Sequence, residues 1–302
     1  TIEVDAGEIA AMLADETAGR LTIGDQAITV NGAITVDNAN LLGLTTSGKV
    51  TATIDTSETV TELATLNADG GTNDLTIVIR AADATAATAA QLNTINDATA
   101  LAVNLTNVTA LAGSSLADLG TLATAITNNQ FSNATGLTTI AVTDTTVDAT
   151  TLATRIDSYD AINGGGATTG MTLASGATIN VDASEIAEML ADETAGRLTI
   201  GDQLITVSGV ISVDTANLLE ATTSGVITAS ITTSETVDEL NTLTGTGNAY
   251  TIVIAGGDAT GSTAAEFNSI NGKTTVAVNM TNVTALAGSS LADLGTLATA
   301  IT

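Results

Sequence analysis

The chain of 302 residues contains no histidine, cysteine, proline or tryptophan, and only 1% of its residues are aromatic. Histidine is the commonest general base and metal ligand, and cysteine supplies the usual thiol nucleophile. Their absence removes the side chains on which much enzyme chemistry depends. It also excludes a disulfide framework, while the redox compartment stays open. We therefore expect a protein that is not an enzyme.

Basic side chains are scarce as well: 6 Lys and Arg stand against 33 Asp and Glu, for a net charge of -27. Nucleic acid and anionic lipid require a basic surface, so neither partner is expected. No apolar run reaches the roughly 18 to 20 residues of a membrane-spanning helix. Mutual repulsion between such acidic chains is largely screened at seawater-like salt, where the screening length is about 3 to 4 Å. The charge therefore favours a saline habitat.

The most informative feature of the sequence is an internal duplication. Residues 1–42 return at 178–219 with 34 identities in 42 positions, an offset of 177 residues. Residues 106–127 then return unchanged at 281–302, at an offset of 175. Similarity this close indicates one structural unit that occurs twice.

The two-residue change in offset lies between Asn67 and Asp74, in a segment that reads as a turn. Turns are where insertions and deletions cost least. We interpret 1–177 as the first repeat unit and 178–302 as a second, incomplete unit. Because arrays of this kind need capping repeats that are not visible here, we expect a piece of a longer array.

Within each unit, short strand patterns alternate with short helical patterns about every 25 residues. This alternation predicts an α/β solenoid of short parallel strands and short helices, in which each coil covers its neighbour. The alternative is a series of small β-rich domains joined by a linker at 163–170. The strands are predicted at 2–4, 28–30, 34–36, 50–54, 75–79, 101–105 and 140–142, and the helices around 9–13, 60–66, 92–95, 116–122 and 152–156.

Local side-chain chemistry supports some of these helices. Ser57 is a predicted helix N-cap with Glu58 in the first turn, where the helix dipole favours a carboxylate, and Ser234 and Glu235 repeat the pattern.

The adjacent carboxylates Asp15 and Glu16 raise the question of an acid/base pair. Glu16 lies four residues before Arg20, and Glu193 lies four residues before Arg197. This spacing favours a salt bridge or solvation at the end of a helix over catalysis.

Several Thr- and Ala-rich segments, among them SETVTELATL, TAAQLNTINDATALAVNLTNVTALAGSSLADL and TAAEFNSINGKTTVAVNMTNVTAL, carry a resemblance to a known group. They resemble the "beta strand repeat" regions of giant secreted or cell-surface proteins, especially of marine cyanobacteria. The resemblance implies an extracellular, structural or adhesive function without catalytic residues.

Calcium is the one cofactor that the sequence raises, because it takes oxygen ligands, which are plentiful here. Asp74 lies in GGTNDLT (70–76), which is similar to the nonapeptide of calcium-binding β-rolls. The second copy has GTGNAYT instead, so a turn explains the segment better. Four more aspartates are predicted at strand ends, where they bind ions between coils or form Asx turns: Asp25, Asp37, Asp202 and Asp214.

These patterns together predict a structural repeat segment of an extracellular fibre, surface layer or stalk. Its partners are expected to be copies of itself or further repeats, which pair through open strand edges end to end. The alternative function is that of an adhesin or a calcium-stabilised spacer that presents a binding surface.

Overall fold

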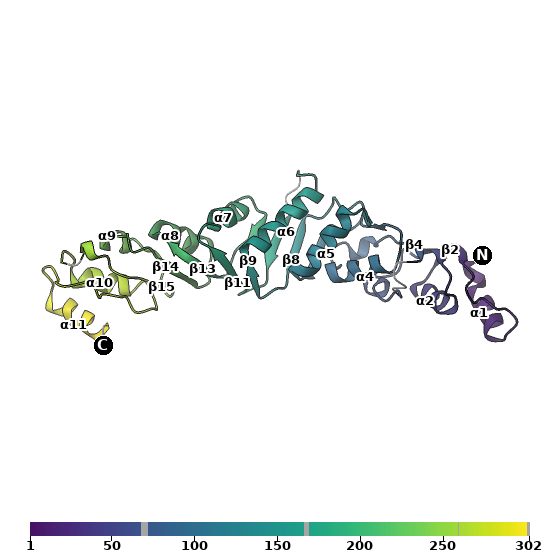
Figure 1. The fold of residues 1–302 in the computed structure, drawn as a ribbon, viewed down its shortest axis with the longest axis horizontal. Helices are drawn as coiled ribbons and strands as arrows, with labels where there is room; N and C mark the ends of the chain where they lie inside the picture. The colour runs from purple at the N-terminus through teal and green to yellow at the C-terminus, as the bar shows by residue number, and fades with distance from the viewer. Residues whose placement is uncertain (68–71, 166–168, 259, 301–302) are drawn as a thin grey trace. The chain divides into compact units, whose positions relative to one another are not determined.

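The computed structural model describes residues 1–67, 72–165, 169–258 and 260–300, in which short strands alternate with short helices (Figure 1). The predicted turn at 68–71 and residues 166–168 of the predicted linker lie outside the described residues. The strands are β1 (Ile2–Asp5), β2 (Ile28–Ile34), β3 (Val50–Ile54), β4 (Asp74–Thr76), β5 (Val103–Asn104), β6 (Ala110–Ser114), β7 (Phe131–Ser132), β8 (Thr139–Val142), β9 (Thr146–Asp148), β10 (Gly170–Leu173), β11 (Thr178–Asp182), β12 (Leu198–Thr199), β13 (Leu204–Ile211), β14 (Ile227–Ile231) and β15 (Ala249–Thr251).

Helices connect these strands along both copies of the repeat. The α-helices are α1 (Ile9–Thr17), α2 (Val36–Thr45), α3 (Val60–Leu63), α4 (Ala89–Asp97), α5 (Leu116–Thr127), α6 (Ala149–Ile162), α7 (Ile186–Thr194), α8 (Val213–Thr222), α9 (Val237–Leu240), α10 (Ala264–Asn271) and α11 (Leu291–Ala300). Three short 3-10 turns are η1 (Ala6–Glu8), η2 (Ala81–Asp83) and η3 (Gly256–Asp258).

The chain forms two compact units, one of residues 1–143 and 154–172 and the other of residues 144–153 and 173–302. In the first unit β1, β2, β3 and β4 form a sheet in that order, and its neighbouring strands are parallel. Ile2 pairs with Ile28, and Ile28 with Val50, so successive strands lie 26 and 22 residues apart. The predicted alternation of short parallel strands with helices is thereby confirmed.

The second unit repeats this arrangement in its own sheet, whose order is β15-β14-β13-β11-β9. Ile179 pairs with Ile205, and Ile205 with Ile227, which reproduces the register of the first unit at an offset of 177 residues. One strand is additional: β9 pairs with β11 on the side away from β13. The equivalent side of β1 carries no strand among the described residues.

The core of each unit is aliphatic and is made by alternate strand residues and one face of each helix. Val50, Ala52 and Ile54 point inward along β3, while Leu119 and Leu122 are fully buried on α5. Burying an aliphatic side chain of this size stabilises the fold by about 1.5 to 3 kcal/mol.

The strand predicted at 34–36 is wrong, because β2 ends at Ile34 and Val36 begins helix α2. The Thr35 hydroxyl accepts a hydrogen bond from the Asn38 N–H and caps this helix. Gly32 adopts a φ of 93°, a left-handed conformation that glycine tolerates, where the pairing with β3 shifts register.

The N-cap predicted at Ser57 also needs correction. Helix α3 is capped by Thr59, whose hydroxyl accepts from the Glu62 N–H while the Glu62 carboxylate accepts from the Thr59 N–H. This capping box forms again around Thr236 in the second copy.

The salt bridge predicted from Glu16 to Arg20 is replaced by one from Asp15. Helix α1 ends at Thr17, and the chain turns back at Gly19, where φ is 68°. The Arg20 guanidinium therefore returns over the last helical turn and lies 2.5 Å from Asp15 Oδ1. The second copy pairs Arg197 with Asp192 in the same way.

Candidate functional site: an open face on the second unit

Side chains from the next coil hold the start of most helices, a role that the sequence patterns did not reveal. The first N–H of a helix has no acceptor within the helix itself. Val60 N–H, at the start of α3, donates to Asp83 Oδ2 at 2.7 Å, across 23 residues of sequence. Ala89 N–H, at the start of α4, donates to Ser114 Oγ at 2.9 Å. We call the side chains in this role inter-coil acceptors; they are Glu58, Asp83 and Ser114 in the first copy and Glu235, Asp258 and Ser289 in the second.

The coil around Asn279 is attached to the preceding coil by three hydrogen bonds of a different kind. Asn279 N–H donates to Ile252 O at 2.9 Å and Ile254 N–H donates to Asn279 O at 3.0 Å. The Asn282 side-chain amide donates to Ile254 O at 2.8 Å. The equivalent coil of the first copy, around Asn104, has the same three hydrogen bonds.

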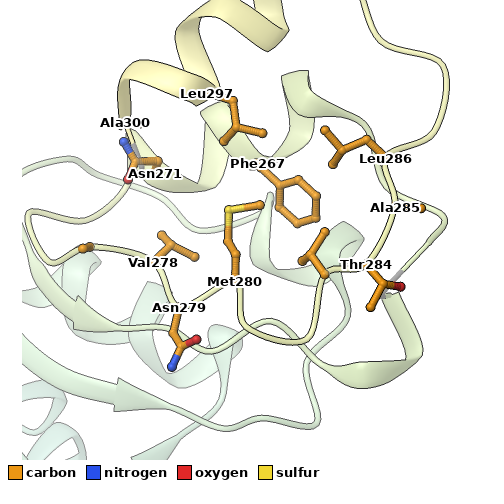
Figure 2. Close-up of a pocket in the computed structure, with 12 residues that line it drawn as sticks. Phe267, Asn271, Val278, Asn279, Met280, Thr284, Ala285, Leu286, Leu297 and Ala300 are labelled. Atoms are coloured by element: carbon orange, nitrogen blue, oxygen red, sulfur yellow. The ribbon is translucent and has the colours of Figure 1, made fainter. Parts of the chain in front are cut away.

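This coil also lines a hollow of about 700 Å³, whose lining is mostly apolar but includes Asn271, Asn279 and Thr284. The Phe267 ring of α10 lies at its centre, with Leu297 of α11, Leu286 and Met280 around it (Figure 2). We call this surface the open face and define it by the following residues: Phe267, Val278, Met280, Val283, Leu286 and Leu297. Phe267 and Leu297 are buried beneath it, and the other four side chains are half-buried.

The first copy shows how helix α11, which borders this surface, looks when it is covered. Leu119 has no exposed surface, whereas its equivalent Leu294 is 36% exposed. Leu116 is 6% exposed, whereas its equivalent Leu291 is 89% exposed. Both pairs lie in segments of identical sequence, so coverage by a further coil, and not local sequence, makes the difference.

Main-chain groups differ in the same way. Val103 N–H donates to Gln130 O at 3.0 Å, and Leu105 N–H donates to Ser132 O at 2.9 Å. The equivalent N–H groups of Val278 and Met280 have no acceptor within the described part of the chain. The open face therefore combines an apolar hollow with the free edge of a strand-like segment, which is a template for another strand.

The space around a glycine in helix α5 also shows that this helix is covered and that its equivalent α11 is not. A methyl group added at Gly120 would lie 2.7 Å from the Arg155 guanidinium carbon, whereas one added at the equivalent Gly295 would meet nothing within 4 Å. Alanine favours a helix interior over glycine by roughly 1 kcal/mol.

We therefore expect Gly295→Ala to stabilise its helix by about 0.5 to 1 kcal/mol, and Gly120→Ala to gain less because Arg155 must move. Hydrogen exchange of the two helices in the single variants measures both effects. Equal gains at the two positions would show that Arg155 does not restrict α5.

The five aspartates considered for calcium lie apart in different settings. Asp37 and Asp214 are exposed in the first turns of α2 and α8, so their prediction at strand ends is wrong. Asp25 is exposed in the turn before β2, and Asp74 pairs with Lys49. Hydrogen bonds from the Ser175 hydroxyl and the Gly176 N–H hold the pKa of Asp202 below its ordinary value.

Among the residues that the structure describes, no group of three or more Asp, Glu, His or Cys side chains is placed to hold a metal ion. We expect chelation with EDTA to leave the melting temperature of the chain unchanged, because single carboxylates bind calcium only weakly. Thermal unfolding with and without millimolar calcium checks this, and a calcium-dependent rise of several degrees would restore the ion sites.

Comparisons with known proteins add no relative to this picture: no family model matches the chain, and no curated protein matches it. No helix in the described ranges is both long enough and apolar enough to cross a membrane.

Proposed function

We propose that this chain is a structural repeat segment of an extracellular fibre, surface layer or stalk. Its coils stack as an α/β solenoid, and the stack pairs end to end with copies of itself or with further repeats. The role is mechanical, and the chain is not an enzyme. Its location is outside the cell.

One observation carries the proposal: hydrogen bonds between coils recur with the same partners in both copies. Asn40 donates from its side chain to Thr65 O at 3.0 Å and accepts from Asn67 N–H at 2.8 Å. In the second copy Asn217 donates to Thr242 O at 3.1 Å and accepts from Thr244 N–H at 2.7 Å. A side chain that satisfies two main-chain groups of the next coil fixes the spacing between coils.

These contacts suit a protein that bears tension or spans distance. Main-chain hydrogen bonds between parallel strands and inter-coil acceptors both act along the direction in which coils succeed each other. A stack of this kind gains stability from each neighbour that is added. It therefore favours long arrays over isolated units.

Both copies leave strand edges that fit end-to-end pairing. Ile179 on β11 is fully buried beside β9, whereas its equivalent Ile2 on β1 is half-buried. Together with the open face, β1 offers main-chain groups for pairing with another chain.

Charge and composition support a location outside the cell. A chain without cysteine has no thiol that an oxidising environment can change. Its 6 basic residues limit the sites for trypsin-like proteases, and Arg80 is also held in an ion pair with Asp83. At high salt the repulsion between acidic surfaces is screened, which permits close assembly.

The test is assembly of the purified chain at low salt and at seawater-like salt. We expect monomers at low salt and end-to-end filaments at high salt, observed by negative-stain imaging and sedimentation. Dispersed monomers under both conditions would count against assembly of this chain.

A further inference from the structure

We propose that the open face is the seat of one particular coil of the repeat, a segment with the chemistry of residues 130–142, supplied by a neighbouring repeat. This inference rests on the proposed function, because it names the partner of one of the edges through which the stack continues. It goes further in specifying the sequence, the register and the contacts of that partner.

The first argument is that the seat has nearly the same sequence in both copies: four of the six residues that define the open face are unchanged, and Phe267 stands where the first copy has Leu92. Residues 281–300 are identical to 106–125, so the helix α11 side and the Val283 and Leu286 side of the seat match the first copy fully. Ahead of them, Val278 corresponds to Val103, and Met280 replaces Leu105. Methionine adapts readily to a site shaped for leucine.

The second argument is that the first copy shows this seat occupied. Strand β7 pairs in parallel with β5, with Phe131 opposite Val103. Strand β8 pairs in parallel with β6, with Ile140 opposite Leu111. Five side chains of this coil are buried, namely Phe131, Ala134, Leu137, Ile140 and Val142.

The third argument is that a parallel strand supplies the hydrogen-bond acceptors that the open face lacks. The N–H groups of Val278 and Met280 need two carbonyl acceptors in a parallel register, which Gln130 and Ser132 supply to the equivalent groups of the first copy. A small apolar molecule fills a hollow of this size but provides no such pair of acceptors. The expected register therefore places the Phe131 equivalent opposite Val278 and the Ile140 equivalent opposite Leu286.

The fourth argument is charge. The segment 130–142, QFSNATGLTTIAV, contains no charged residue, so it can approach a chain of net charge -27 without repulsion. The β1 edge of a second copy brings Glu3, Asp5 and Glu8 within its first coil. Like charges brought together at an interface oppose binding, so the uncharged coil is the better occupant.

The experiment uses the full chain and a fluorescently labelled synthetic peptide of residues 128–143. We expect saturable binding of one peptide per chain, measured by fluorescence anisotropy. Replacing Phe131 or Leu137 by Asp in the peptide should weaken binding at least tenfold, and a scrambled peptide should not bind. Changes made in the peptide leave the folded chain untouched.

A matched pair of variants locates the site on the chain. Leu286→Asp should weaken peptide binding at least tenfold, whereas Leu44→Asp, at an exposed position on α2, should leave it unchanged. On binding, the amide protons of Val278 and Met280 should become protected from exchange. This NMR measurement does not depend on any substitution.

Three results would overturn the inference: no peptide binding, equal binding of the scrambled peptide, or binding that Leu286→Asp leaves intact. A complex of two chains at this face that the peptide does not displace would also overturn it, since the occupant would then be a whole second copy. Filaments without peptide binding would support the proposed function and overturn this inference. Peptide binding without filaments would support the seat while counting against assembly.

Discussion

Leu119→Ala is expected to lower the free energy of unfolding by about 2 to 5 kcal/mol, whereas Leu294→Ala should lower it by about 1 kcal/mol or less. Leu119 is fully buried on α5, and Leu294 is 36% exposed on α11. Truncating a fully covered leucine removes all of its burial and leaves a closed cavity, while truncating a partly exposed leucine removes less burial and leaves a space that water can fill. The two residues occupy the same place in identical sequence, so helix propensity and local charge cancel.

Hydrogen exchange of each helix is the appropriate measurement, combined with urea unfolding of the whole chain. Arrays of repeats can unfold in parts, so a single global midpoint does not assign the loss to one helix. The control is Leu44→Ala, which removes an exposed leucine from α2. Similar losses for Leu119→Ala and Leu294→Ala would contradict the difference in coverage.

Asp83→Ala should destabilise the first unit by about 2 to 3 kcal/mol, because it removes an inter-coil acceptor and strands its donors. Asp83 is 7% exposed. Its Oδ2 atom accepts from Val60 N–H at 2.7 Å and from Arg80 Nε at 2.9 Å. Without it, the first N–H of α3 loses its acceptor, and the part-buried Arg80 guanidinium is left with its hydrogen bond to Ser57 O.

The matched control for this prediction is Asp83→Asn, which keeps an oxygen acceptor for Val60 N–H but loses the charge. We expect it to cost roughly half as much as alanine. Asp37→Ala, at an exposed position in α2, should change stability by less than about 0.5 kcal/mol. If urea unfolding ranked Asn and Ala at position 83 equally, the ion pair with Arg80 alone would explain the loss and the inter-coil bond would not.

Strands with a regular alternation could be predicted from the sequence, and β3 has the bounds expected for it. Helix α2 was missed because its buried face consists of Val36, Ala39 and Leu42, where a small alanine weakens the apolar pattern. The Thr35 cap was the signal that could have found it. Strand β7 was missed because two residues are too short to show a pattern.

Inter-coil acceptors cannot be predicted from local sequence patterns, for a physical reason. The side chains that fill the role are Asp, Glu or Ser, and each bonds a main-chain group 21 to 25 residues away. In the sequence such a residue cannot be told apart from one in an ordinary turn or helix cap. Glu58, for example, has the sequence position of a first-turn carboxylate, but it accepts a hydrogen bond from Val36 N–H. Only the stacking of coils shows what it binds.

The open face could not be predicted from its own residues at all. Because 106–127 and 281–302 are identical, no local property distinguishes the covered copy from the open one. What differs is what packs over the segment: in the first copy β7 and β8 pair with it, and Tyr159 of α6 donates a hydrogen bond to Leu119 O at 3.1 Å. The candidate calcium ligands show a related limit. Asp25 and Asp202 are suitable ligands by side-chain type, but the sequence does not show which carboxylates lie close together in the fold.

The most direct test of the stacking account extends the chain by the sequence of residues 128–177 after Thr302 and repeats Leu294→Ala in that background. The added coil should cover the open face, so the cost of the substitution should rise from about 1 kcal/mol or less to the roughly 2 to 5 kcal/mol expected for Leu119→Ala. A cost that stays small in the extended chain would contradict the claim that successive coils of this repeat cover and stabilise one another.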